Sequence, residues 1–226
     1  RSAWLASIGE MKGDSAVRDI QNLPDSGHLY AAHVISDLWR VTEGNAIVVT
    51  DVGQHQMRVA QAYPFARPRR WLTSGGLGTM GFGLPAAIGA ALAEPEATVL
   101  CFSGDGSFLL NCQELATLRE ENLKVKIILL DNRGYGLVNQ QQDLFYGKRR
   151  FAVAFKHPVD FLQLAASFGI EGFSMTANDA EERLQIALAA PGPSLIHQLE
   201  KLVDVEQVRR HPADHAVFRE LEAYFS

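Results

Sequence analysis

The chain has 226 residues, 47% of them hydrophobic and 21% charged, so one globular domain with extensions can bury a core without disulfides or metals. The net charge is −5, and the sequence contains no run of lysines or arginines. Neither nucleic acid nor an anionic membrane surface is therefore suggested as a partner. Two cysteines without disulfide or metal-site spacing predict a reducing, cytoplasmic location, and no apolar stretch approaches the roughly 20 residues of a membrane helix.

The first 27 residues predict a linker from a preceding domain. They mix a short amphipathic piece with turn-forming residues and end in Leu23-Pro24-Asp25-Ser26-Gly27. The chain also begins at Arg1 rather than at a methionine. Both features predict that it is a piece of a longer polypeptide.

Residues 28–200 predict a domain in which helices and strands alternate. Helical patterns lie near 28–43, 79–93, 111–121, 158–168 and 179–189, and strand patterns lie at 46–50, 98–102, 125–130, 172–176 and 194–199. The strands are apolar, β-branched runs without alternation, which is typical of a parallel sheet buried on both faces. The predicted fold class is therefore α/β, with three layers and a mostly parallel sheet. Residues 201–226 predict a charged helical extension.

Three predicted strands end in loops that suit a phosphate ligand and a metal. The loops are Asp51–Met57, Ser103–Ser107 and Asp131–Gly136, and ligands of such sheets lie beyond the carboxyl ends of the strands. Gly104 and Gly106 bracket Asp105, while Asn132 ends the next strand along the chain. Mg²⁺ prefers oxygen ligands and shares them with phosphates, and a helix opening near residue 107 would add its N–H groups. A Gly-Asp-Gly triplet alone is more often an ordinary turn with a capping aspartate.

The triplet followed by Asn132 at the next strand end resembles the signature of thiamine diphosphate enzymes. The run WLTSGGLGTMGFGLPAAIGAAL at 71–92 and the run GQHQM at 53–57 resemble the catalytic subunit of acetolactate (acetohydroxyacid) synthases almost residue for residue. The runs GLVNQQQ at 136–142 and LFY at 144–146 are most similar to the isozyme I branch. The resemblance covers about residues 28–200 and implies the thiamine diphosphate-binding fold of the C-terminal domain.

The resemblance also implies which residues bind the cofactor. The Mg²⁺ ligands would be the side chains of Asp105 and Asn132 and the carbonyl of Gly134. The full set of implied cofactor-binding positions is Val52, Gly53, Gln54, His55, Gly78, Met80, Gly104, Asp105, Gly106, Ser107, Asn132, Gly134, Gly136, Leu137 and Val138.

Within that set the implied roles differ. The diphosphate would be held by Gln54, His55, Gly106, Ser107 and Gly136. Met80 would be the apolar wedge beneath the bent cofactor, the Gly78 carbonyl would accept a hydrogen bond from the aminopyrimidine, and Leu137 and Val138 would line the reacting face. The alternatives are a core methionine for Met80 and a capping or surface histidine for His55.

The sequence departs from the family at several positions. Many members have tryptophan at the position of Gln141, where it favours 2-ketobutyrate as second substrate, so Gln141 leaves that preference open. Arg133 and Tyr135 are also not the family's usual residues. After Glu200 the family's proline-rich tail is not recognisable.

The implied activity is that of a transferase in branched-chain amino acid biosynthesis. It decarboxylates pyruvate and joins the remaining two-carbon unit to a second 2-keto acid, pyruvate or 2-ketobutyrate. The glutamate that activates the cofactor belongs to the pyrimidine-binding domain of a partner subunit, and FAD is bound mainly by another domain. The chain therefore contains no catalytic residue of its own and is predicted to be inactive alone. The implied parent is a homodimer or homotetramer, with a regulatory small subunit as a further partner.

Two kinds of alternative remain open. Glyoxylate carboligase, sulfoacetaldehyde acetyltransferase and 2-keto acid decarboxylases share the metal motif but differ around residues 137–142. A non-catalytic nucleotide-binding or regulatory α/β module would instead use residues 104–106 for another phosphate ligand.

Overall fold

The computed structural model describes residues 1–4, 6, 7 and 29–199. The predicted linker over 1–27 lies outside the described residues except for 1–4, 6 and 7, and the predicted extension over 201–226 lies wholly outside them. Among the described helices, none combines the length and the apolar character that crossing a membrane requires.

A single sheet of six parallel strands forms the centre of the described part. Its order is β2-β1-β3-β4-β6-β5, and every pairing is parallel. The strands are β1 (Ile47–Thr50), β2 (Trp71–Thr73), β3 (Val99–Gly104), β4 (Val125–Asp131), β5 (Glu171–Ser174) and β6 (Ser194–Leu199). The predicted α/β class and parallel sheet are therefore confirmed.

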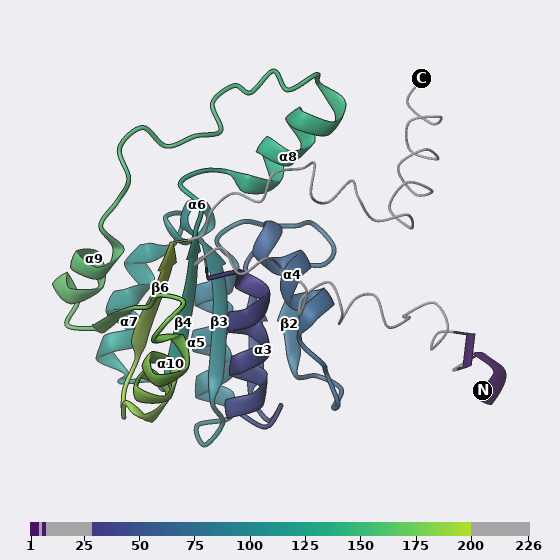
Figure 1. Ribbon diagram of the computed structural model, residues 1–226. Coiled ribbons are helices and arrows are strands. Elements are labelled where there is room, and N and C mark those ends of the chain that lie inside the picture. Colours follow the sequence, from purple (N-terminus) through teal and green to yellow (C-terminus); the bar gives the residue numbers. More distant parts are fainter. Residues whose placement is uncertain (5, 8–28, 200–226) are drawn as a thin grey trace.

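Helices cover both faces of this sheet, as Figure 1 shows. They are α3 (Ala31–Val41), α4 (Gln54–Ala62), α5 (Gly83–Ala93), α6 (Asp105–Phe108), a 3₁₀ turn (Cys112–Glu114), α7 (Leu115–Glu120), α8 (Gly136–Phe145), α9 (Phe161–Ser167) and α10 (Ala180–Ala189). Alternate strand residues point to opposite faces. Val49 packs in the core that includes side chains of α5, α7 and α9, whereas Val48 packs in the core that includes side chains of α3, α4 and α10.

Four of the predicted strands are present within about two residues, and β5 begins slightly earlier than expected. The helix predicted over 79–93 begins only at Gly83, because Gly78 and Gly81 adopt positive φ angles of 63° and 90°, which end regular helix geometry. The helix predicted over 111–121 is divided into the 3₁₀ turn and α7. Helices α4 and α8 and strand β2 were not predicted.

The order of the strands brings the three candidate loops to one edge. Strand β3 pairs with β1 on one side and with β4 on the other, all in the same direction. The loops after these three strands therefore meet at the carboxyl edge of the sheet, and α8 lies beyond that edge (Figure 1).

Candidate functional site

The loops after β1, β3 and β4 enclose a cavity with about 540 Å³ of empty space, part of it open to solvent. Its lining consists of Val52, Gly53, Gln54, His55, Met80, Gly104, Asp105, Gly106, Ser107, Leu130, Asn132, Gly134, Tyr135, Gly136, Leu137 and Val138. The structure thus gathers all of the predicted cofactor-binding residues here except Gly78. Gly78 lies next to the lining, since a Cβ added to it would be 3.9 Å from Cγ1 of Val52. Gln141 is not part of the lining.

His55 forms one wall of the cavity from the first turn of α4. Its ring lies against the backbone of two glycines, because a Cβ on Gly104 would be 3.0 Å from Nδ1 and one on Gly53 would be 2.8 Å from Cε1. Burial lowers the pKa of His55 to about 4, although a hydrogen bond to the Asp51 carbonyl opposes this shift. The ring is therefore neutral at pH 7. Its Nε2 atom is buried without a hydrogen-bond partner, so a polar group in the cavity would satisfy it.

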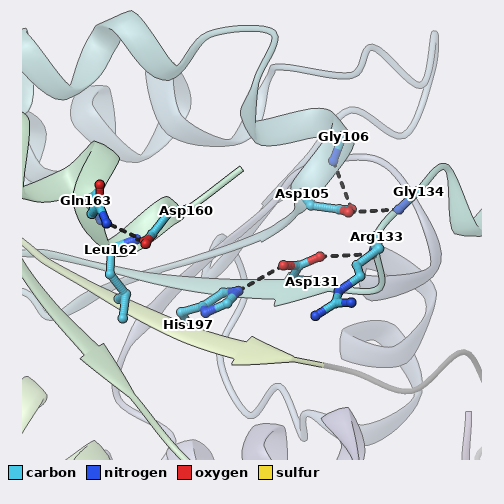
Figure 2. A network of polar contacts seen from close by, with 9 residues as sticks. All are labelled: Asp105, Gly106, Asp131, Arg133, Gly134, Asp160, Leu162, Gln163 and His197. Carbon is cyan, nitrogen blue, oxygen red and sulfur yellow. Dashed lines mark hydrogen bonds and ion pairs between the residues drawn. The ribbon is translucent and has the colours of Figure 1, made fainter. Parts of the chain in front are cut away.

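Asp105 lies at the end of β3, where its carboxylate accepts two backbone N–H groups. Oδ1 is 2.9 Å from the amide nitrogen of Gly106 and Oδ2 is 2.8 Å from that of Gly134 (Figure 2). Burial raises the pKa of Asp105 to about 7, and interaction with the nearby Asp131 carboxyl adds to the rise. Two neighbouring buried carboxyls repel each other when both are ionised. A cation bound beside Asp105 would offset this repulsion.

Asn132 presents a second oxygen in the turn after β4. Its Oδ1 is buried without a hydrogen-bond partner, while Nδ2 lies 3.5 Å from Oε1 of Gln54. The following residue, Arg133, has a φ of 59°, so the chain turns back and brings the Gly134 amide to Asp105. The described residues contain no group of three His, Cys, Asp or Glu side chains placed to hold a metal ion. The oxygens of Asp105 and Asn132 suit instead a hard cation that shares its ligands with a phosphate.

Two further contacts join the walls of the cavity. Ser107 donates its hydroxyl hydrogen to the Val52 carbonyl at 2.8 Å, and Gln54 donates from Nε2 to Oε1 of Gln140 at 2.9 Å. The first links the loops after β3 and β1, and the second links α4 to α8. Met80, Leu137 and Val138 add apolar surface to the lining.

Sequence reasoning gave no role to several residues that build this site. Asp51 is buried and accepts hydrogen bonds from the amides of Gly81 and Gly83 at 2.9 and 3.0 Å, which ties the Met80 loop to β1. Tyr135 lines the cavity and packs edge-on against Phe155, with ring centroids 5.0 Å apart. Leu130 lines the cavity from β4. Of these residues, only Asp51 could have been found from the sequence, since it directly follows a predicted strand.

The chain was compared with known proteins. Residues 51–198 match the family described as thiamine pyrophosphate enzyme, C-terminal TPP binding domain. The acetolactate synthase isozyme 1 large subunit of Escherichia coli (strain K12) is 59% identical over 156 residues, which are 69% of this chain and 28% of that protein. The acetolactate synthase 2, chloroplastic, of Brassica napus is 49% identical over 175 residues, 74% of this chain and 27% of that protein.

A third relative aligns with a larger share of the chain. The probable acetolactate synthase large subunit of Methanococcus aeolicus is 41% identical over 202 residues, 86% of this chain and 33% of that protein. The chain thus spans about a third of the length of the curated relatives it matches. The family match covers the loops after β1, β3 and β4 together with strands β3 and β4, and it begins directly after β1. The chain therefore belongs to the thiamine pyrophosphate enzyme family, and residues 51–198 form its C-terminal TPP-binding domain.

Proposed function

We propose that this chain is the part of an acetolactate synthase catalytic subunit that binds thiamine diphosphate and Mg²⁺. The observation that carries the proposal is the cavity between three strand ends, in which Nε2 of His55 and Oδ1 of Asn132 are buried without a hydrogen-bond partner among the described residues. Relatives named acetolactate synthase support the choice of activity within the family. The parent enzyme would condense pyruvate with a second 2-keto acid, with loss of CO₂, in branched-chain amino acid biosynthesis.

Asp105, Asn132 and the carbonyl of Gly134 would hold Mg²⁺. The buried carboxyl of Asp105, the neighbouring carboxyl of Asp131 and the unsatisfied oxygen of Asn132 support a cation there. The diphosphate would lie against Gln54, His55, Gly106, Ser107 and Gly136, all of which line the cavity. When bound, thiamine diphosphate supplies a nucleophilic carbon and accepts the electron pair released in decarboxylation.

The chain's apolar residues would shape the reacting end. Met80 would support the bent cofactor, with the carbonyl of Gly78 beside it, and Leu137 and Val138 would exclude water from the reacting face. Gln141 lies later on α8 and outside the lining. The substrate-side role proposed for Gln141 therefore rests on the resemblance, and the preference for a second substrate stays open.

A partner would complete the site. None of the described residues that line the cavity is a glutamate. The activating glutamate would come from the pyrimidine-binding domain of a partner subunit, in a homodimer or homotetramer. Exposed apolar side chains at Met57 and Leu77 support a covering surface of this kind, since Leu77 is 94% exposed. FAD, bound mainly by another domain, a regulatory small subunit and a cytoplasmic location belong to the same proposal.

The alternatives have less support. Glyoxylate carboligase, sulfoacetaldehyde acetyltransferase and 2-keto acid decarboxylases would share the metal ligands, but the relatives reported above carry acetolactate synthase names. A non-catalytic module for another phosphate ligand loses its basis, because the chain belongs to a family of thiamine pyrophosphate enzymes.

The test is acetolactate formation from pyruvate in the presence of thiamine diphosphate, Mg²⁺ and FAD. We expect no activity from this chain alone and activity when it is mixed with an N-terminal fragment of an acetolactate synthase. Product analysis separates acetolactate from the acetaldehyde that a decarboxylase would release. Activity of the chain alone would contradict a divided active site, and silence of a mixture whose fragments associate would contradict the assigned reaction.

The affinity for Mg²⁺ should depend on pH through Asp105. Its pKa is raised to about 7, and Mg²⁺ binds only the ionised carboxylate, so protons compete with the metal below that pH. We expect the apparent Mg²⁺ affinity to fall by up to about tenfold per pH unit below 7 through Asp105 and to level off above it. Protonation of the ligand's terminal phosphate, whose last pKa is about 6, adds to the fall at lower pH. Calorimetric titration of thiamine diphosphate at graded Mg²⁺ concentrations measures this. A profile without slope between pH 6 and 7 would contradict it, since His55, with its pKa of about 4, titrates lower.

Gly136 should not tolerate a side chain. A Cβ there would lie 2.3 Å from Nδ2 of Asn132 and 2.4 Å from Oε1 of Gln54, so Gly136→Ala would displace a metal ligand and a diphosphate ligand together. We expect affinity for thiamine diphosphate with Mg²⁺ to fall at least about tenfold, a loss of about 1.4 kcal/mol, in a calorimetric titration. Gly89→Ala is the matched control, because a Cβ there meets nothing within 4 Å, and in helix α5 alanine is favoured by about 1 kcal/mol. Equal affinities of the two variants would contradict the close approach.

A further inference from the structure

A buried, hydrogen-bonded pair of side chains lies next to the candidate metal ligands. Asp131, the last residue of β4, has its Oδ2 atom 2.9 Å from Nε2 of His197 on β6 (Figure 2). Both side chains are largely buried, with exposed fractions of 5% and 19%. Strand register explains the contact, because His197 is paired with Leu129, two residues before Asp131, and residues two apart on a strand share a face.

Asp131 connects this pair to each candidate ligand of the cation. Its carboxyl interacts with that of Asp105, and Asn132 is the next residue in the chain. Its Oδ1 atom accepts the backbone N–H of Arg133 at 2.9 Å, which closes the turn that returns the Gly134 amide to Asp105. The Asp131 side chain therefore helps to hold this turn, together with the backbone hydrogen bonds between the turn and residues 153 and 155.

His197 is the side chain that fixes Asp131 from the neighbouring strand. The Asp131 carboxylate accepts from His197 at one oxygen and from the turn at the other, so it cannot rotate without losing one of them. The imidazole is itself supported by Phe161 of α9, with ring centroids 5.9 Å apart. A residue that holds a ligand-bearing turn in this way acts like the outer partners that orient metal ligands.

We propose that His197 is a positioning residue for the cation site: through Asp131 it fixes the turn over residues 131–134 so that Asn132 and Gly134 present their oxygens to the cation beside Asp105. The inference rests on the proposed function, because it assumes the Mg²⁺–thiamine diphosphate site. His197 itself is not part of the cavity lining. Replacing His197 should therefore lower the affinity for Mg²⁺ strongly, while it lowers the stability of the fold less.

The test compares His197→Asn with His197→Gln in this 226-residue chain. The terminal amide of glutamine can reach Asp131 as Nε2 of histidine does, whereas that of asparagine is one methylene short. The readout is the Mg²⁺ concentration that gives half-maximal thiamine diphosphate binding by calorimetry, with the melting temperature recorded alongside. We expect that concentration to rise about ten- to a hundredfold in His197→Asn and to stay within about threefold of the original in His197→Gln. If His197→Asn does not fold, His197→Leu takes its place.

Asp160→Ala is the control for a purely structural effect. Asp160 is the N-cap of α9, accepts the backbone N–H groups of Leu162 and Gln163, and is drawn beside the same network in Figure 2. Its removal should lower the melting temperature without moving the Mg²⁺ midpoint. If His197→Asn behaves like Asp160→Ala, the positioning role is overturned while the proposed function stands. If the unmodified chain shows no Mg²⁺-dependent binding, the proposed function fails and the inference falls with it.

Discussion

Replacing Asp105 with asparagine is expected to abolish Mg²⁺-dependent binding of thiamine diphosphate, with an affinity loss of at least about a hundredfold, or about 2.7 kcal/mol. The substitution removes the negative charge that the cation needs, at the only carboxylate in the cavity lining of the described residues. It also turns an amide N–H₂ group toward one of the two backbone N–H groups, those of Gly106 and Gly134, that now donate to the carboxylate at 2.9 and 2.8 Å. One of these two hydrogen bonds would be lost together with the charge.

The measurement is a calorimetric titration of thiamine diphosphate at saturating Mg²⁺, with inorganic diphosphate as a second ligand. Asp160→Asn is the matched control, since it removes one carboxylate that also accepts backbone N–H groups but lies outside the cavity lining (Figure 2). Its affinity should equal that of the original chain. Undiminished, Mg²⁺-dependent binding by Asp105→Asn would remove Asp105 from the metal site.

Patterns of apolar residues predicted the centre of the fold but not its margins. Strands β1, β3, β4 and β6 are buried runs, so their composition alone identifies them. Strand β2 has only three half-buried residues at an edge of the sheet, which is too short for a periodic signal. Helices α4 and α8 begin directly after Gly53 and Tyr135 and carry mostly polar side chains. Neither sequence therefore shows a helical apolar stripe that is clear enough to predict a helix, although Val59 of α4 packs in the core.

The residues of the candidate site could likewise be predicted only in part. Asp105 and Asn132 could be predicted because each sits at the end of a recognisable strand, and parallel strands bring such positions to one edge. Asp51 and His197 could not be given roles, because their partners lie 32 and 66 residues away in the sequence. No local sequence pattern shows which strands become neighbours in the sheet, or which of their side chains then lie next to each other. Contacts of this kind are set by the packed sheet, and they hold the ligand-bearing loops in place.

Replacing Asp51 with alanine should therefore destabilise the protein more than any exposed substitution. The carboxylate is 1% exposed and accepts the backbone N–H groups of Val52, Gly81 and Gly83 at 2.7, 2.9 and 3.0 Å. Without it, three backbone donors are left without their acceptor, at about 1–3 kcal/mol for each buried one. Burial also raises the pKa of Asp51, so the native charge carries a cost that its removal relieves. We expect a net loss of about 3 kcal/mol in the free energy of unfolding, measured by urea denaturation.

Two further variants distinguish the effect of losing these buried hydrogen bonds from the effect of losing an exposed helix cap. Asp160→Ala also removes a carboxylate that accepts backbone N–H groups, but at an exposed site, and it should cost only about 1 kcal/mol. Asp51→Asn keeps one acceptor oxygen and should fall between the two. Because the amides of Gly81 and Gly83 flank the Met80 loop, Asp51→Ala should also weaken thiamine diphosphate binding in the fraction that remains folded. Equal stabilities of Asp51→Ala and Asp160→Ala would mean that water replaces the lost acceptor, and that Asp51 does not hold the loop.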